Sequence, residues 1–245
     1  MNRIALVTGG SGGIGREICK RLAADRCTVL VGYAGGKERA TALVDELGGA
    51  PHTAVHVDIT DHDSLTALAS TIADEHDRLD VLVNCSGVTR GVQHDDLTGL
   101  DDELIDRIFT INWRGPFATI RVMEDLLRKA GEAVIINISS IAGVTGVGSN
   151  VAYCASKAAL DSMTRSLARA LAPQIRVVSV SPGWVEGEYA ATMDPAMLQA
   201  QRDATPLGKL ASGADVGAAV SAVINHLPQT TGAIIPVDGG RPLGT

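Results

Sequence analysis

Short apolar segments alternate with amphipathic helical segments along almost the whole chain. The apolar segments lie at residues 4–8, 28–32, 52–57, 80–84, 132–139, 175–180 and 233–237. Parallel strands need a crossover of a dozen or more residues, usually a helix, whereas antiparallel strands can be joined by a tight turn. The alternation therefore predicts an α/β fold in one domain, residues 1–245, with a doubly wound seven-stranded parallel sheet and helices on both faces.

Composition agrees with a buried aliphatic sheet and excludes several kinds of partner. Of the 245 residues, 45% are hydrophobic but only 3% are aromatic, which suits parallel strands covered on both faces. The net charge of -7 and the lack of a basic run argue against nucleic acid. No apolar run reaches the roughly 18 residues of a membrane span. The four cysteines lack paired spacing, so we expect reduced thiols in a cytoplasmic protein, and we assign no metal site.

A glycine-rich turn joins the first strand to the first helix. It reads Gly-Gly-Ser-Gly-Gly-Ile-Gly, directly ahead of the predicted helix. Glycine lets a backbone approach a pyrophosphate closely, and a helix N-terminus offers free N–H groups. Gly10, Gly12 and Gly15 fit the spacing G-x-G-x-x-G, whereas Gly9, Gly13 and Gly15 fit Thr-Gly-x3-Gly-x-Gly. Both registers predict a dinucleotide site rather than a merely flexible turn.

The end of the second strand favours NADP(H) over NAD(H). An acidic residue there would bind the adenosine ribose hydroxyls of NAD(H), but residues 32–37 read Gly-Tyr-Ala-Gly-Gly-Lys. Small residues leave room for a 2′-phosphate, and Lys37 can pair with it. The alternative is that Lys37 only begins the next helix and is exposed. The missing carboxylate decides for NADP(H).

Tyr153 and Lys157 are the candidate chemical groups. Four residues apart on a predicted helix, they lie on one face. A phenol has a pKa of about 10, and a neighbouring ammonium lowers this pKa because it favours the phenolate. Ser140, at the end of the preceding strand, can hydrogen-bond the same substrate oxygen. The three residues predict a proton-transfer site, although a solvated helix surface can show the same Tyr-x3-Lys spacing by chance.

Asn112 lies four residues before a proline inside a predicted helix that starts near residue 101. Pro116 has no N–H to donate to the Asn112 carbonyl, so we expect this carbonyl to be free and the helix to kink. A free carbonyl near Lys157 can hold a water that passes protons to solvent. The alternative is an ordinary kink that serves packing alone.

These motifs together resemble the short-chain dehydrogenase/reductase family over essentially the whole chain. Besides the glycine turn and Tyr153-x3-Lys157, the order and spacing of the family are matched by Asp58, Asn84-x2-Gly87, Asn112, Ser140, Pro182-Gly183 and Asp238-Gly-Gly. The resemblance, which is to the branch of 3-oxoacyl-[acyl-carrier-protein] reductases, implies a Rossmann fold, an NAD(P)-dependent oxidoreductase and a homotetramer.

The resemblance also implies roles for single residues. Tyr153 would be the general acid/base, Lys157 would lower its pKa and hold the nicotinamide ribose, and Asn112 would anchor a water relay. Ser140, preferred to Ser139 because of its spacing from Tyr153, would orient the substrate carbonyl. Together with Lys37, the cofactor-binding residues would be Gly9, Ser11, Gly13, Ile14, Gly15, Tyr33, Asp58, Ile59, Asn84, Gly87, Tyr153, Lys157, Pro182, Gly183 and Val185.

Three positions depart from the family pattern. Cys85 and Ser86 stand where Asn-Ala is usual, so packing near the cofactor is expected to change. Gly187 replaces a threonine that often contacts the cofactor, and Gly12 replaces a basic residue common in NADP(H) users. The first of these glycines removes a cofactor contact, and the second argues against NADP(H).

The predicted reaction is hydride transfer between NADP(H) and a ketone or secondary alcohol, with reduction of 3-oxoacyl thioesters as the first candidate. A basic contact for a carrier protein, often found before the sixth strand, is replaced by Pro173-Gln174, and Arg128-Lys129 can serve instead. The alternatives are an alcohol, sugar or polyol dehydrogenase and a non-catalytic dinucleotide-binding regulator. Residues 184–213 show weak periodicity and are predicted to form a substrate loop or lid.

Overall fold

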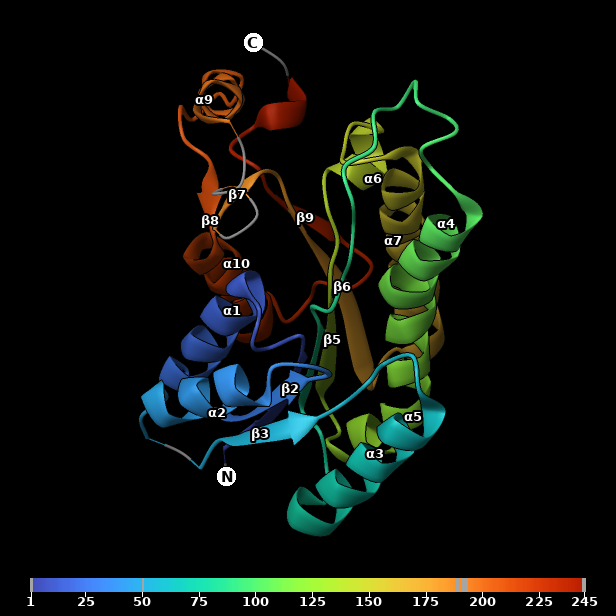
Figure 1. Ribbon diagram of the computed structural model, residues 1–245. Coiled ribbons are helices and arrows are strands. Elements are labelled where there is room, and N and C mark those ends of the chain that lie inside the picture. The colour runs from blue at the N-terminus through green and yellow to red at the C-terminus, as the bar shows by residue number, and fades with distance from the viewer. Residues whose placement is uncertain (1, 50, 188–189, 191–193, 244–245) are drawn as a thin grey trace.

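A seven-stranded parallel sheet with the strand order β3-β2-β1-β4-β5-β6-β9 forms the centre of the molecule (Figure 1). The computed structural model describes residues 2–49, 51–187, 190 and 194–243. The strands are β1 (Ile4–Thr8), β2 (Thr28–Tyr33), β3 (Thr53–His56), β4 (Val81–Asn84), β5 (Ala133–Ile138), β6 (Ile175–Pro182) and β9 (Ile234–Val237). The doubly wound parallel α/β fold that the sequence predicts is confirmed.

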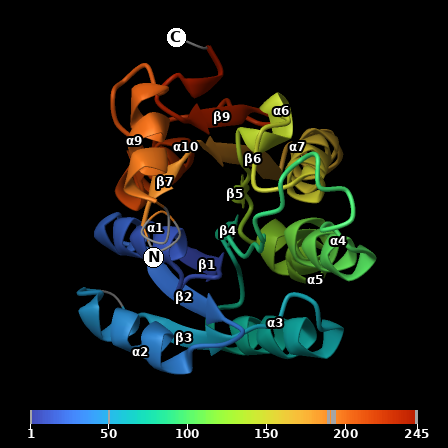
Figure 2. The same ribbon diagram turned by 45° about the horizontal axis from the view of Figure 1, so that its top comes forward.

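Helices cover both faces of this sheet. On one face lie α1 (Gly13–Ala24), α2 (Lys37–Glu46) and α10 (Gly213–Asn225); on the other lie α3 (His62–His76), α5 (Gly115–Lys129) and α7 (Val151–Leu171) (Figure 2). Successive side chains of a strand point to opposite faces, so Ala5 and Val7 of β1 pack into one aliphatic core cluster and Ile4 and Leu6 into the other. The burial of both faces explains why the strands read as continuous apolar runs.

The edges of the sheet and the helix starts follow local sequence signals. β9 carries Pro236 and lies at the edge, where a missing backbone N–H costs no ladder hydrogen bond. Asp61 caps α3 by accepting a hydrogen bond from the Asp63 N–H at 3.0 Å. Within the described ranges, no helix combines the length and apolar character needed to cross a bilayer.

The predicted kink before Pro116 takes the form of a π-helical turn. α4 (Asp102–Phe109) continues through η1 (Thr110–Arg114) into α5, and the Gly115 N–H donates to the Thr110 carbonyl, five residues back. Such single turns carry one residue more than an α-helical turn and are frequent at functional sites. The wider turn lies directly ahead of the proline, where the α-helical hydrogen-bond pattern cannot continue.

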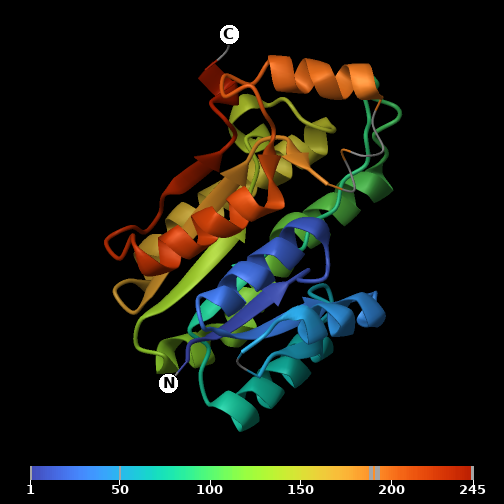
Figure 3. The ribbon, with the colours of Figure 1, turned by 90° about the vertical axis from the view of Figure 1, so that its left-hand side faces the viewer.

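The segment 184–213 is more regular than its sequence suggests. It contains β7 (Val185–Glu186), α9 (Pro195–Asp203) and β8 (Ala211–Ser212), and β7 pairs in parallel with β8. Asp194 accepts hydrogen bonds from the N–H groups of Ala196 and Met197, and Pro195 occupies the first turn of α9. This cap and proline were a readable signal for a helix start. Figure 3 shows α9 across the same end of the molecule as the short helix α6 (Ala142–Thr145) and the chain after β9.

Candidate active site

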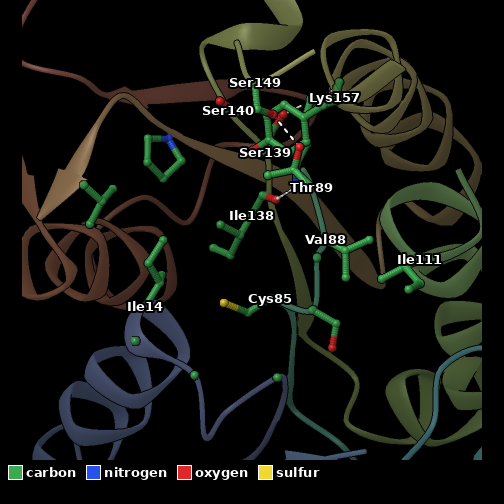
Figure 4. Close-up of a pocket in the computed structure, with 18 of the residues that line it drawn as sticks. Ile14, Cys85, Val88, Thr89, Ile111, Ile138, Ser139, Ser140, Ser149 and Lys157 are labelled. Carbon is green, nitrogen blue, oxygen red and sulfur yellow. Dashed lines mark hydrogen bonds between the residues drawn. The ribbon is translucent and has the colours of Figure 1, made fainter. Parts of the chain in front are cut away.

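A cleft of about 1470 Å³ opens where the chain leaves the carboxyl ends of the strands. The strand order reverses between β1 and β4, and open α/β sheets bind ligands at such a point. Figure 4 shows Ser140 and Lys157 together at one end of the cleft, with Ile14 and Cys85 toward the other end. The cleft therefore joins the glycine turn to the predicted proton-transfer residues.

The glycine turn forms a cradle at the N-terminus of α1. A Cβ on Gly15 would lie 2.2 Å from the Gly9 carbonyl oxygen, so this position can only be glycine, and Gly9 has a φ of 66°. A Cβ on Gly13 would meet no atom within 4 Å, and the helix has no side-chain cap at Gly12. The open space and the uncapped N–H groups fit the pyrophosphate of a dinucleotide.

α7 presents Tyr153 and Lys157 to the cleft. Asn150 caps this helix by accepting from the Tyr153 N–H at 2.7 Å, and its amide also donates to the Arg90 carbonyl at 2.8 Å. The Lys157 Nζ lies 5.7 Å from the centre of the Tyr153 ring and donates to the Ile138 carbonyl at 2.8 Å. The predicted pair is thus brought together on one wall.

Lys157 is buried, and burial lowers the pKa of its ammonium to about 8, while Cys85 and Asp161 act in the opposite direction. The ammonium is therefore present at neutral pH and lost in mild alkali. Because the local dielectric constant is low in this buried site, the ammonium charge acts strongly on a neighbouring phenol.

The two serines after β5 differ in where their hydroxyls are engaged. Ser139 is buried, and its Oγ donates to the Lys157 carbonyl at 3.4 Å, toward α7. The Ser140 Oγ accepts from the Ala142 N–H at 3.2 Å, which leaves its own O–H for another acceptor. This geometry supports Ser140 as the residue that orients a substrate oxygen.

Asn112 does not line the cleft, and its side chain is fully engaged. Its Oδ1 accepts from the Val88 N–H at 2.8 Å, and its Nδ2 donates to the Val88 carbonyl at 3.0 Å and to the Ser156 Oγ at 3.1 Å. The amide thus fastens the segment after β4 to the turn of α7 that carries Lys157. The predicted relay through the Asn112 backbone carbonyl stays a prediction.

Two predicted cofactor residues do not reach the cleft. Asn84 is paired with Asn137 in the β4–β5 register, so its amide donates to the Asn137 Oδ1 at 2.9 Å inside the protein. Lys37 is the first residue of α2 and is exposed to solvent. Both residues lie at or shortly after the end of a strand, as predicted, but their side chains do not line the cleft.

Arg39 takes the position that the sequence assigned to Lys37. It lines the cleft, and a Cβ on Gly36 would come within 2.9 Å of the Arg39 Nε, so the guanidinium lies over this glycine. Gly36 has a φ of 79°, a left-handed conformation that turns α2 at its start. Both basic residues are exposed to solvent, but only Arg39 lines the cleft.

The remaining predicted cofactor residues border the cleft. Asp58 accepts from the Thr60 Oγ1 at 2.7 Å and from the Thr60 N–H at 2.8 Å, and these bonds hold the pKa of its carboxyl below the ordinary value. The predicted residues that line the cleft are Gly9, Ser11, Gly13, Ile14, Gly15, Tyr33, Asp58, Ile59, Gly87, Ser140, Tyr153, Lys157, Pro182, Gly183 and Val185.

The far end of the cleft, opposite the glycine turn, contains two residues that sequence reasoning did not assign individually. They are Gln201 of α9, which belongs to the predicted segment 184–213, and Arg241 of the turn η2 (Arg241–Leu243). No motif marks Gln201 or Arg241, because a helix and a C-terminal turn distant in sequence meet only in the folded chain.

Comparisons with known proteins agree over almost the full length. A family model described as enoyl-(acyl carrier protein) reductase matches residues 9–241. A protein named as a ketoacyl reductase of the granaticin polyketide synthase of Streptomyces violaceoruber is 34% identical over 98% of this chain and 96% of its own. A 3-oxoacyl-[acyl-carrier-protein] reductase of Staphylococcus aureus is 32% identical over 98% of both chains.

A solved structure gives the same result for the fold. The crystal structure of a short-chain dehydrogenase/reductase from Burkholderia xenovorans matches with a TM-score of 0.91 and 30% identity over 99% of both chains. The chain therefore belongs to the short-chain dehydrogenase/reductase family and is an oxidoreductase.

Proposed function

We propose that this enzyme reduces a ketone to a secondary alcohol with NADPH, and that 3-oxoacyl compounds are its substrate class. The observation that carries the proposal is the placement of Tyr153, Lys157 and Ser140 on the same cleft as the uncapped N-terminus of α1. The names of the relatives, ketoacyl reductase and 3-oxoacyl-[acyl-carrier-protein] reductase, support the substrate class.

Three residues of the chain have different roles at the substrate oxygen. When bound, the nicotinamide supplies the hydride. Ser140 donates a hydrogen bond that fixes the carbonyl, and Tyr153 gives its phenolic proton to the oxygen as negative charge develops there. The Lys157 ammonium, one helical turn away, stabilises the phenolate that remains. The reverse direction uses the same groups, with Tyr153 as the base.

A panel of substrates tests this function. NADPH oxidation is followed with 3-oxoacyl thioesters, 3-oxo esters and simple ketones, and the reverse reaction with secondary alcohols. Turnover is expected with the 3-oxo compounds. Cofactor binding without turnover across the whole panel would instead support a non-catalytic regulator, and turnover confined to sugars or polyols would support the dehydrogenase alternative.

The surface at Arg128 and Lys129 favours small substrates over a carrier protein. Arg128 is paired with Glu124 at 2.8 Å and donates to the Gln174 Oε1 at 2.5 Å, and Lys129 is paired with Asp77 at 2.7 Å. The neighbouring acids offset both cations, so these residues offer little free positive charge to an acidic partner. We therefore place free 3-oxoacyl compounds ahead of carrier-bound ones.

We propose Arg39 as the residue that selects NADP(H). A guanidinium beside the end of β2 pairs well with a 2′-phosphate, and no carboxylate follows β2 before α2. Arg39→Ala should raise the KM for NADPH roughly tenfold to a hundredfold, as expected for a charge-assisted hydrogen bond, and change the KM for NADH much less. Lys37→Ala is the matched control and should affect both cofactors little. Equal effects of Arg39→Ala on the two cofactors would contradict the assignment.

We also propose a cytoplasmic homotetramer. All four cysteines are free thiols, three of them buried, which suits a reducing compartment. Light scattering of the purified protein measures the assembly directly.

A further inference from the structure

The far end of the cleft holds a guanidinium that has no acidic partner among the described residues. Arg241 donates from Nη1 to the Gln201 carbonyl at 3.0 Å and from Nη2 to the Gln201 Oε1 at 2.6 Å. Both acceptors are neutral. Arg241 is half-buried, and a cation held only by neutral oxygens keeps its positive charge available to an anion.

Two other charged side chains of the cleft lining are compensated by ion pairs. Glu186, which lines the cleft, is paired with Arg202 at 3.1 Å. Arg90, also a lining residue, is paired with Asp101 at 3.3 Å. Arg107 lies on α4, on the other side of the molecule from α9 (Figure 1). Arg241 is thus the cleft-lining cation beside α9 whose charge the described residues leave uncompensated.

Backbone contacts connect Arg241 to the catalytic edge. Its N–H donates to the Asp238 carbonyl at 3.3 Å, and Asp238 packs so closely on Gly183 that a Cβ there would come within 3.0 Å of the Asp238 Cα. Pro182, the neighbour of Gly183, accepts from the N–H of Ile141 at 3.0 Å. Ile141 directly follows Ser140, and both Ser140 and Arg241 line the cleft.

The hydrogen bonds to Gln201 hold the guanidinium in place and use one N–H of each terminal nitrogen. Each terminal nitrogen carries a second N–H, and this pair of donors can bind the two oxygens of one oxyanion. Guanidinium groups match the geometry of carboxylates and phosphates, whereas an uncharged ester or amide offers a weaker acceptor.

We propose that Arg241 binds an oxyanion carried by the ketone substrate, so that the enzyme prefers 3-oxo acids or phosphorylated ketones over their uncharged analogues. This inference rests on the proposed ketone reduction and names its substrate class more closely. Because Gln201 belongs to α9, the bound anion also contacts the segment that covers this end of the cleft.

Matched substrate pairs test the proposal. The wild type and Arg241→Gln are compared on 3-oxobutanoate and its methyl ester, and on dihydroxyacetone phosphate and dihydroxyacetone, so that the two pairs distinguish a carboxylate from a phosphate. In at least one pair, the wild type should prefer the anion, and Arg241→Gln should lower the ratio of the two kcat/KM values about 10- to 100-fold, mainly through KM. Arg241→Lys should restore part of the preference, because it keeps the charge. Arg169→Gln is the control, because Arg169 is exposed near the C-terminal end of α7 and does not line the cleft, and it should leave the ratio as it is.

The contrary outcomes are distinct. If the wild type reduces the charged and uncharged members equally, or Arg241→Gln keeps the ratio, the oxyanion site is refuted while ketone reduction stands. If Arg241→Gln instead raises the KM for NADPH with the ester as substrate, the guanidinium contacts the cofactor and the proposal is wrong. If no ketone is reduced, the proposed function fails, and calorimetry with butanoate and inorganic phosphate still decides the site: at least tenfold weaker binding to Arg241→Gln supports it, and equal binding refutes it.

Discussion

Replacing Tyr153 by phenylalanine is expected to lower kcat roughly 10²- to 10⁴-fold while NADPH still binds, because general acid catalysis contributes about that factor. The change removes one hydroxyl and keeps the ring that packs 5.7 Å from the Lys157 Nζ. The cap on α7 also survives, since Asn150 accepts from the Tyr153 backbone N–H. The loss should therefore concern the proton and not the fold.

Three measurements on the same preparation separate these effects. Stopped-flow absorbance at the NADPH band gives the chemical step, fluorescence titration gives the cofactor dissociation constant, and circular dichroism gives the melting temperature. A variant that keeps near wild-type turnover would remove Tyr153 from the reaction. A variant that melts early or no longer binds NADPH would mean that the hydroxyl serves structure or cofactor binding instead.

Lys157→Met is expected to abolish turnover and, at the same time, to stabilise the cofactor-free protein. Burial lowers the pKa of this ammonium from 10.5 to about 8, and a difference of that size corresponds to roughly 3 kcal/mol of destabilisation at neutral pH. Loss of the hydrogen bond to the Ile138 carbonyl offsets about 1 kcal/mol. The remaining gain of roughly 2 kcal/mol should raise the melting temperature by about 4–8 °C in a protein of this length.

The dependence on pH fixes the sign of this effect. Between pH 8 and 10.5 the unfolded chain keeps the lysine proton that the folded chain has released, so the stability of the wild type rises with pH across this window. The advantage of Lys157→Met should be full below about pH 8 and vanish above about pH 10.5. Melting curves at pH 7 and pH 10 measure it. Equal melting temperatures of the two proteins at pH 7 would show that burial of the ammonium does not destabilise the folded protein.

The same titration has a kinetic side. If the charged form of Lys157 supports the Tyr153 phenolate, kcat/KM for the ketone should fall as pH rises through about 8 in the free enzyme.

Most of the fold could be predicted because its signals are local. Apolar runs, capping residues such as Asp61 and the proline of β9 each act within a few residues: Asp61 caps α3, and β9 lies at the edge of the sheet. The helix α9 was missed because only weak periodicity marks it, although Asp194 and Pro195 signal its start.

The parts of the site that a backbone motif forms could be predicted from the sequence. The parts that depend on the direction of single side chains could be predicted less well. Gly15 is fixed by contact with the Gly9 carbonyl, so the cradle follows from the sequence. Asn84 and Lys37 were assigned by position alone, but the β4–β5 register brings Asn84 to Asn137, and Lys37 is exposed at the start of α2, outside the cleft lining. Arg241 and Gln201 meet through tertiary contacts that no short motif can encode.

The segment after β4 is fastened to α7 at two points, which sets where this enzyme can adapt. The Asn112 side chain hydrogen-bonds both the N–H and the carbonyl of Val88, and the Asn150 side chain donates to the Arg90 carbonyl. A different backbone path in this segment would leave these side-chain amides without hydrogen-bond partners. Each buried group left unsatisfied would destabilise the folded protein by about 1–3 kcal/mol. Substitutions that change substrate selectivity should therefore be tolerated less in this segment than on the opposite wall of the cleft. Libraries of variants for altered selectivity should target residues 184–213 and the C-terminal turn.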